Sequence, residues 1–349
     1  MSNKPLNKIR IGWDIGGAHI KYCVESDGTN IIWYDLLDYE FWNGYKGFRD
    51  IIKNINYIYY KKKIRIKNYF TMSAEMCDCF DDRNAGVEYI INEIKCSGCE
   101  SYVFTRNGFV RPDKIVNKEY MNVASHNWYA SALYISKFYQ NAIAVDFGST
   151  TCDFLIIKSN RVINKRTSDF SGLETRELLY TGCARTPLYS YLNEVKYDGR
   201  KFKIIPEQFS SMSDIYIILN KLKPKDIYSK VLDGSDNTKI NAYKRVSRSF
   251  GFDFTKSKKN LVNNLSKKIY TTQIRLIEDE LKYHKNKYFS GIPDIKIIGL
   301  GLGHNTISDI CKKNKIKYEN ISKLLDSEIV AGSSMIKLFP SFVMCRLEI

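Results

Sequence analysis

Apolar and polar positions alternate in three short runs at the start of the chain, which is the pattern of half-buried β-strands. These runs are separated by glycine and polar residues, and they cover residues 9–15, 20–25 and 31–36. The period then changes to that of a helix, which leads into a cluster of three lysines at 61–63. The apolar residues at helical spacing are Phe48, Ile51, Ile52, Ile55 and Ile58. The first third of the chain is therefore predicted to run strand, strand, strand, helix.

The same two periods continue along the rest of the sequence. Further strands are predicted at residues 69–72, 102–105, 142–147, 152–157 and 295–298. Further helices are predicted at residues 85–94, 126–139 and 322–338, with a helical middle before the last strand. Strands and helices that alternate in this way indicate an α/β protein.

A strand, a glycine turn and a second strand occur twice. The first instance is WDIGGAHIK at residues 13–21, and the second is VDFGSTTCD at residues 145–153. In each, an Asp ends an apolar strand, and glycine lets backbone N–H groups approach a ligand closely. A third glycine turn, formed by Gly299, Gly301 and Gly303, follows the last predicted strand. Internal similarity of this kind indicates two related units.

The residues of these turns suit an anion such as a phosphate group. One such turn alone is also typical of an ordinary hairpin, but two of them and a late glycine turn favour a binding site. The candidate phosphate-binding residues are Gly16, Gly17, Lys21, Gly148, Ser149, Thr150 and Thr151. Asp14 and Asp146 are candidates to hold a divalent cation, expected to be Mg²⁺, against phosphate oxygens.

This arrangement resembles the actin, sugar kinase and heat-shock ATPase superfold, which is ribonuclease H-like. The resemblance implies two related actin-like α/β domains, with an interdomain cleft to which each domain contributes one phosphate-binding hairpin. It places the first domain at residues 1–140, completed by a C-terminal helix at about 322–349. The second domain is expected at residues 141–321 with a helical insertion, and the late glycine turn is expected to meet a nucleoside.

Composition narrows the class of protein. The chain has 349 residues, 44% of them hydrophobic, so it can bury a sizeable core and is not disordered. Its net charge of +16 fits lysines scattered on solvated faces, given the general surplus of Lys, Asn, Ile and Tyr, or a basic cleft for an anion. No apolar run is long enough for a membrane span, residues 1–10 lack a signal-peptide core, and the nine cysteines are odd in number. A cytoplasmic protein with reduced thiols is expected.

Longer sequence words between the turns resemble the methanofuran-biosynthesis synthase family (MfnF), which is similar to hydantoinases. The words are GWDIGGAHIK at 12–21, TMSAEMCDCFDDRNAGV at 71–87, VASHNWYA at 123–130, DFGSTTCD at 146–153 and TGCARTP at 181–187. SDIY at 213–216, DG at 233–234 and residues 245–248 extend the resemblance. His126 stands where the family usually has a small residue, which argues against a catalytic role for it.

The resemblance implies a transferase that condenses (5-aminomethyl-furan-3-yl)methyl diphosphate with the phenol oxygen of γ-glutamyltyramine. The products are an aryl furfuryl ether and diphosphate. It implies small-molecule partners, with no nucleic acid and no membrane. It also implies a phosphate-binding site that does not require ATP. The sequence does not choose between γ-glutamyltyramine, tyramine and tyrosine as acceptor, and it does not give the oligomeric state.

The implied reaction needs a general base, because a phenol of pKa about 10 is scarcely ionised at neutral pH. Glu75 is the first candidate, and Asp78 and His19 are the alternates; an ion-paired or helix-starting carboxylate is the other interpretation of Glu75. Arg83 is a candidate to bind diphosphate, unless it pairs with a neighbouring Asp at 81 or 82. Asn127 and Trp128 are candidates to contact a substrate ring, although Trp128 equally fits a core position.

Two other classes of function stay open at this point. One is an ATP-dependent kinase or hydantoinase-like hydrolase of the same superfold, and the other is a non-catalytic nucleotide-binding or RNA-binding module. Four thiols also offer a structural zinc site, at Cys77, Cys79, Cys96 and Cys99. Against that site, Cys77 and Cys79 belong to a family word.

Overall fold

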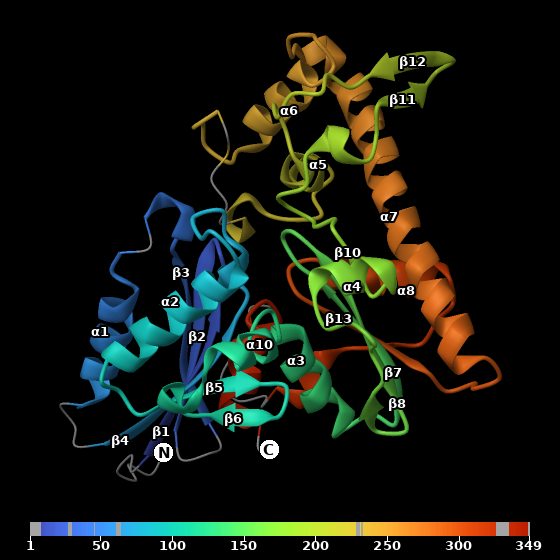
Figure 1. The fold of residues 1–349 in the computed structure, drawn as a ribbon. Coiled ribbons are helices and arrows are strands. Elements are labelled where there is room, and N and C mark those ends of the chain that lie inside the picture. The colour runs from blue at the N-terminus through green and yellow to red at the C-terminus, as the bar shows by residue number, and fades with distance from the viewer. Residues whose placement is uncertain are drawn as a thin grey trace, which may run out of the picture. The chain divides into compact units, whose positions relative to one another are not determined.

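The computed structural model divides the chain into two compact units, each built around its own sheet (Figure 1). Unit 1 comprises Met1–Gln140, Ile157–Ile163 and Asn320–Ile349, and unit 2 comprises Asn141–Ile156 and Asn164–Glu319. The structure describes residues 8–26, 30–44, 46–60, 64–227, 231, 233–325 and 335–347. The lysine cluster 61–63 lies outside the described residues.

The division differs from the expected boundaries at residues 157–163, which group with unit 1. Hydrogen bonds explain the difference, because the Asn160 backbone N–H donates to the Gln140 carbonyl over 3.1 Å. The Asn160 side-chain amide also donates to the Ser136 carbonyl over 3.2 Å. The end of this hairpin is thus fastened to the last helix of unit 1 before the second sheet.

Unit 1 contains a six-stranded sheet in the order β3-β2-β1-β4-β5-β6. Its strands are β1 (Lys8–Ile15), β2 (His19–Ser26), β3 (Asn30–Asp38), β4 (Arg65–Met72), β5 (Ser101–Thr105) and β6 (Gly108–Val110). Its helices are α1 (Phe48–Tyr60), α2 (Arg83–Cys96), α3 (Asn127–Ser136) and α10 (Phe339–Arg346). Short 3₁₀ turns lie at η1 (Phe41–Asn43), η2 (Ala74–Met76), η3 (Pro112–Lys114), η4 (Asn117–Asn122) and η8 (Ile321–Leu324).

The core of unit 1 is centred on Trp13, which is fully buried in β1. Its ring stacks on Phe70 at 5.4 Å, and its indole N–H donates to Asn68 Oδ1 over 3.0 Å, so the polar atom is satisfied. The helix predicted from Phe48 to Ile58 is confirmed as α1, in which Phe48, Ile52 and Ile55 are buried and Ile58 is exposed.

The C-terminal segment packs on this sheet through a glycine. A side chain at Gly12 would place its Cβ 2.1 Å from the Ser341 carbonyl, so only glycine admits α10 against β1. Of the helix predicted at 322–338, the structure has η8 at the start and helical residues 335–336 near the end, and α10 follows. Residues 326–334 between them lie outside the described residues.

Unit 2 contains a sheet in the order β10-β8-β7-β13-β14, with β9 paired to β8. Its strands are β7 (Asn141–Phe147), β8 (Cys152–Lys158), β10 (Leu178–Leu179), β13 (Lys296–Leu300) and β14 (Tyr318–Glu319), and a separate hairpin is formed by β11 (Glu194–Tyr197) and β12 (Arg200–Lys203). The short β9 (Arg161–Val162) belongs to the segment 157–163 that groups with unit 1. Its helices are α4 (Asp169–Glu174), α5 (Met212–Ile218), α6 (Lys239–Arg248), α7 (Lys259–Phe289) and α8 (His304–Lys313). Short turns lie at η5 (Leu188–Ser190), η6 (Pro224–Asp226) and η7 (Lys256–Lys258). In Figure 1, α7 runs from the β11–β12 hairpin to the sheet.

The two sheets share one topology. Leaving aside β6, β9 and the separate β11–β12 hairpin, strands numbered by their place in each unit lie in the order 3-2-1-4-5 in both. In unit 1, β2 is antiparallel to β1, and β4 is parallel to it. In unit 2, β13 is likewise parallel to β7, and β10 is antiparallel to β8. The predicted α/β fold with two related units is confirmed. Within the described residues, no helix is both long and apolar enough to span a bilayer.

Candidate functional site

The glycine turn of unit 1 joins β1 to β2 in a tight hairpin. The Gly16 N–H donates to the His19 carbonyl over 3.0 Å, and the register places Asp14 opposite Lys21. The Lys21 ammonium lies 2.9 Å from Asp14 Oδ2, and Asp14 is only 1% exposed. The predicted phosphate ligand and the predicted metal ligand are therefore each other's partners.

The second face of this hairpin is covered by the sequence word at 71–87. A Cβ on Gly17 would lie 2.5 Å from the Cys77 sulfur, which explains the glycine. The Ser73 N–H donates to the Ile15 carbonyl over 2.8 Å, at the point where β1 ends. Two family words that are about 50 residues apart in sequence thus meet at one turn.

Glu75 is held in place by two contacts. It lies in η2 and is 1% exposed, and Ser125 Oγ donates to its Oε1 over 2.5 Å. Ser125 has a φ of +50°, in the left-handed region that non-glycine residues rarely adopt. A Cβ on Gly86 would lie 2.6 Å from the Glu75 carbonyl, so α2 packs directly on this backbone. The carboxylate is fixed in position.

The other predicted acid–base residues have more open surroundings. Asp78 is exposed, and His19 Nε2 lies 4.0 Å from Asp38 Oδ1. Arg83 begins α2 and approaches the Met76 sulfur at 3.1 Å, and no ion pair to Arg83 is found among the described residues. Asp82 instead caps α2, accepting from the Ala85 N–H over 2.8 Å.

Asn127 joins the unit 1 hairpin, whereas Trp128 lies in a packed cluster. Asn127 begins α3, and its side-chain amide N lies 3.5 Å from Asp14 Oδ1. Its amide oxygen accepts from the Trp128 N–H over 2.8 Å. Trp128 is 8% exposed and packs edge-on against Tyr129 at 5.5 Å.

The glycine turn of unit 2 has the same geometry but a different support. The Gly148 N–H donates to the Thr151 carbonyl over 2.9 Å. Behind the turn, the N–H groups of Ala184 and Arg185 both donate to the Ser149 carbonyl, over 3.2 and 2.8 Å. A Cβ on Gly182 would lie 2.1 Å from that carbonyl, so the TGCARTP word requires glycine there.

A buried glutamine fastens this supporting loop to α7. Gln273 is fully buried, and its side-chain N–H₂ donates to Thr181 Oγ1 over 2.9 Å and to the Gly182 carbonyl over 2.8 Å. Its oxygen accepts from the Tyr216 hydroxyl over 3.0 Å. The helical insertion therefore fixes the geometry of the Gly148 turn.

The late glycine turn lies against the same strand end. Leu300 of β13 is in register with Asp146 of β7, so the turn that follows reaches the carboxylate. A Cβ on Gly301, which has a φ of +74°, would lie 2.5 Å from Asp146 Oδ1. A Cβ on Gly303 would lie 2.1 Å from the Phe147 ring, and a Cβ on Gly299 would lie 2.9 Å from the His304 carbonyl. In unit 2 the structure thus brings together Asp146, the Gly148 turn and the late turn.

Three charged residues beside the Gly148 turn were missed from the sequence. Thr151 Oγ1 donates to Asp153 Oδ2 over 3.1 Å, and Arg166 Nη1 lies 2.7 Å from Asp153 Oδ1. Arg166 is 2% exposed. Its backbone N–H donates to the buried Glu177 carboxylate over 3.0 Å. The second Asp of DFGSTTCD could have indicated this ion pair. Arg166 and Glu177 lie outside the motifs that resemble the family.

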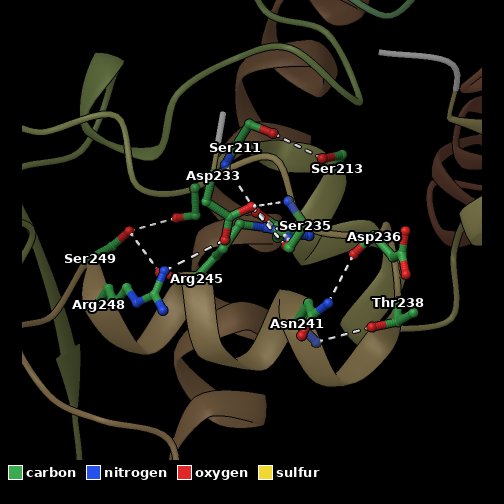
Figure 2. Close-up of polar contacts among 12 residues, drawn as sticks. Ser211, Ser213, Asp233, Ser235, Asp236, Thr238, Asn241, Arg245, Arg248 and Ser249 are labelled. Atoms are coloured by element: carbon green, nitrogen blue, oxygen red, sulfur yellow. Dashed lines mark hydrogen bonds and ion pairs between the residues drawn. The ribbon is translucent and has the colours of Figure 1, made fainter. Parts of the chain in front are cut away.

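Three other family words meet at a second ion cluster of unit 2, shown in Figure 2. Arg245 is 2% exposed, and its guanidinium lies 2.7 Å from Asp214 and donates to Ser235 Oγ over 2.8 Å. Asp233 accepts from Arg245 over 3.4 Å. Burial raises the pKa of the Asp214 carboxyl, and the hydrogen bond from Arg245 opposes that change. The cluster reaches the Gly148 turn through α5, because the Ser213 N–H donates to the Ala184 carbonyl over 3.0 Å.

The thiols do not gather into a metal site. All nine cysteines are free of disulfides. In the part of the chain that the structure describes, no group of three or more His, Cys, Asp or Glu side chains is arranged to hold a metal ion. Cys77, Cys79, Cys96 and Cys99, all of which are described, therefore form no four-thiol zinc site.

Two curated relatives that resemble this chain come from Methanocaldococcus jannaschii and Methanococcus vannielii. A protein from Methanocaldococcus jannaschii is 29% identical over 97% of this chain and 96% of its own length. A protein from Methanococcus vannielii is 29% identical over 54% of this chain and 85% of its own length. Both are named (4-{4-[2-(gamma-L-glutamylamino)ethyl]phenoxymethyl}furan-2-yl)methanamine synthase, which confirms the predicted resemblance to the methanofuran-biosynthesis synthases.

A solved structure supports the fold, and a family profile gives the family. Nucleotide-free acetone carboxylase superposes with a TM-score of 0.54 at 9% identity, over 97% of this chain and 70% of that chain. The profile described as hydantoinase/oxoprolinase matches residues 68–303, which is more than half of the sequence. That span contains η2 with Glu75, the Gly148 turn and the late glycine turn. The chain belongs to the hydantoinase/oxoprolinase family.

Proposed function

We propose that this chain is the synthase that joins (5-aminomethyl-furan-3-yl)methyl diphosphate to the phenol oxygen of γ-glutamyltyramine. The observation that carries the proposal is the 97% coverage by a relative whose name spells out the phenoxymethylfuran product. The geometry supports it, because the family words form two glycine hairpins and a fixed carboxylate. The substrates and the class of transferase, with diphosphate as leaving group, are part of the proposal.

The reaction balances as a displacement at one carbon. The phenol oxygen forms a bond to the furfuryl CH₂, and the bond from that carbon to the diphosphate oxygen breaks. The diphosphate leaves with the electron pair, and the phenol proton passes to a base. The electron-rich furan ring spreads the positive charge that develops as the leaving group departs. No oxidant, reductant or ATP is required.

The Gly148 turn would bind the departing diphosphate. Its turn geometry is fixed from behind by the N–H groups of Ala184 and Arg185, and it carries the hydroxyls of Ser149 and Thr150 3.5 Å apart. Hydrogen bonds to a charged group contribute about 1.5–3 kcal/mol each, so two or three could lower the barrier materially. In unit 1, Lys21 is the candidate cation, and Arg83 at the start of α2 is the second candidate.

Glu75 is the proposed base for the phenol proton. The Ser125 hydroxyl binds its carboxylate and the Gly86 contact holds its backbone, and a positioned base contributes about 10² to 10⁴-fold. Asp78 and His19, in their more open surroundings, are the alternates. Asn127, beside Asp14, is proposed to contact the substrate.

The residues of unit 2 fit an Mg²⁺ ion beside the diphosphate. Asp146 supplies a carboxylate, and Gly301 lets the late turn pack against it, because a Cβ there would lie only 2.5 Å from Asp146 Oδ1. Bound Mg²⁺ would neutralise charge that develops on the diphosphate oxygens. Carboxylate and hydroxyl oxygens are the ligands that this ion prefers.

The decisive experiment supplies the purified chain with the furfuryl diphosphate, γ-glutamyltyramine and Mg²⁺. We expect the ether and one equivalent of diphosphate, at the same rate with and without ATP. Tyramine and tyrosine in place of the acceptor identify its specificity. Absence of the ether with all three acceptors would refute the proposed function.

A pair of glutamine variants tests the base. Glu75→Gln should lower kcat about 10² to 10⁴-fold with little change in diphosphate affinity. Glu88→Gln, on the exposed face of α2, is the matched control and should leave kcat unchanged. Equal kcat in both variants would transfer the role to Asp78 or His19.

A further inference from the structure

The hairpin of unit 2 sorts its side chains onto two faces. Phe147, Cys152 and Phe154 are fully buried on one face, whereas Asp146, Thr151 and Asp153 are half-buried on the other. Extending the register of the Gly148–Thr151 turn places Asp146 directly opposite Asp153. Alternation along the strand puts Thr151 on that same face. Gly148, opposite Thr151, has no side chain to cover it.

Hydrogen-bond chemistry then fixes which way the Thr151 hydroxyl faces. A carboxylate only accepts hydrogen bonds, so across the 3.1 Å contact Thr151 must donate its proton to Asp153. Arg166, 2.7 Å from the other carboxylate oxygen, balances the charge of Asp153 and holds it in place. The hydroxyl has one proton and two lone pairs, so only its lone pairs remain for a ligand.

We infer that Thr151 presents its oxygen to the Mg²⁺ ion that accompanies the diphosphate, and donates no hydrogen bond to the phosphate itself. Asp153 and Arg166 are the positioning residues that impose this orientation. Ser149 and Thr150 share one long hydrogen bond of 3.5 Å in which either hydroxyl can donate, so at least one of their two protons stays available for the phosphate oxygens. The inference rests on the proposed function, because it takes diphosphate and Mg²⁺ as the ligands.

The inference divides the roles of the two hairpins. In unit 1 the residue opposite the Asp is Lys21, so that carboxylate already has a cation at 2.9 Å. In unit 2 the residue opposite is a second carboxylate, and its cation, Arg166, is 2% exposed beneath it. The Asp146 carboxylate and the Thr151 hydroxyl oxygen on one hairpin face are the kinds of ligand that Mg²⁺ prefers, so the cation that arrives with the ligand is assigned to unit 2.

Calorimetric titration with inorganic diphosphate, in Mg²⁺ or in EDTA, tests the orientation without any turnover. For Thr151→Val we expect the affinity in Mg²⁺ to fall on the order of tenfold and the affinity in EDTA to stay unchanged. Thr151→Ser should restore the Mg²⁺ effect. Ser149→Ala is the matched control and should weaken binding by the same factor in both buffers.

A second variant changes the orientation without removing the hydroxyl. In Asp153→Asn the side-chain N–H₂ can donate to Thr151, which frees the hydroxyl proton for the phosphate. We expect the Mg²⁺ enhancement to shrink about tenfold while the affinity in EDTA holds or rises a few-fold. Thermal unfolding confirms that each variant is folded.

The outcomes separate the two levels of the argument. Equal weakening of Thr151→Val in Mg²⁺ and EDTA would mean that Thr151 donates to phosphate, and no change in either buffer would remove it from the site. Both results overturn the inference and leave the proposed function standing. A wild-type protein that binds no diphosphate in either buffer and forms no ether would overturn the proposed function.

Discussion

The two glycine hairpins have the same turn geometry and opposite electrostatics. Each places the N–H of a glycine on a carbonyl three residues later, over 3.0 Å in unit 1 and 2.9 Å in unit 2. Asp14 faces a lysine across its hairpin, whereas Asp146 faces Asp153. A duplicated backbone motif has therefore kept its shape while the charges on its two copies diverged.

The supports behind the hairpins differ as well. The space at Gly17 is bounded by the sulfur of Cys77, which is a side chain that can rotate. The space beside Ser149 is bounded by the Gly182 backbone, where an added Cβ would lie 2.1 Å from the Ser149 carbonyl. The unit 2 hairpin is thus supported by backbone at this point, whereas the unit 1 hairpin is supported by a side chain.

The largest expected effect comes from the buried cation of unit 2. Arg166→Met leaves Asp153 without its partner, and breaking a buried ion pair costs about 3–5 kcal/mol. We expect a marked fall in the melting temperature, together with loss of the Mg²⁺ enhancement of diphosphate binding. The melting temperature is read by circular dichroism and the enhancement by calorimetry.

Arg245→Met is the matched control for that variant. Arg245 is equally buried, but its pair with Asp214 lies in the cluster of Figure 2 and not on the hairpin face. It should lower the melting temperature by a similar amount and leave the ratio of affinities in Mg²⁺ and EDTA unchanged. If diphosphate affinity in both variants becomes the same in Mg²⁺ and in EDTA, the Mg²⁺ enhancement depends on general stability and not on the orientation of Thr151.

The next largest effect concerns Gly182 and Gly17, the glycines that allow close packing beside the two hairpins. Gly182→Ala forces a methyl group onto a backbone carbonyl and should cost about 3 kcal/mol, near the upper end of overpacking effects. Gly17→Ala meets only the Cys77 side chain and should cost about 1 kcal/mol. Denaturant unfolding of the two variants gives the comparison.

A double variant makes the contrast specific. Because one sulfur causes the clash at Gly17, Cys77→Ala should rescue most of the loss in Gly17→Ala. No single side-chain truncation is expected to rescue Gly182→Ala. A Gly17→Ala variant that stays as unstable in the Cys77→Ala background would show that the unit 1 turn is also held by its backbone.

A smaller effect separates the roles of Asp14 and Asp146. Asp14→Asn removes the anion that competes for Lys21, so diphosphate affinity should hold or rise a few-fold in both buffers. Asp146→Asn should lower the affinity only in Mg²⁺. Calorimetry in the two buffers distinguishes them, and an Mg²⁺-specific loss in Asp14→Asn would return the cation to unit 1.

The sequence predicted the hairpins well because their information is local. An Asp at a strand end, a glycine and a second strand specify one turn wherever they occur. Both copies form a hairpin between the two predicted strands. The fold class followed from the repeat, since two such hairpins with the same strand order are hard to build otherwise.

The partners of the candidate site residues were not predicted, because these pairs form only in the folded structure and no local pattern specifies them. Nothing in the sequence links Arg166 to Asp153 or Ser125 to Glu75, which is 50 residues away. The pairing of Lys21 with Asp14 was also missed, although the register places them face to face. Which charged side chains pair with each other depends on the folded structure. Lys21 and Asp14 had instead each been predicted to bind a separate ligand.

The smallest expected effect concerns acid. His284 on α7 is fully buried behind the unit 2 sheet, where its ring lies 5.4 Å from Phe154 of β8. Burial lowers the pKa of this imidazole below its ordinary value of 6.5, and its contact with the Arg176 carbonyl opposes that change only in part. The unfolded chain therefore binds the proton more tightly than the folded chain does.

Linkage then gives the sign of the pH effect. Stability is full above about pH 6.5, where His284 is neutral in both states, and it is lost as the pH falls towards the lowered folded-state pKa. We expect the melting temperature of the wild type to drop by about 2–4 °C more than that of His284→Gln between pH 8 and pH 5. Parallel curves would mean that burial of this ring imposes no protonation cost on unit 2, and the acid sensitivity of the two units would then be set by their carboxylates alone.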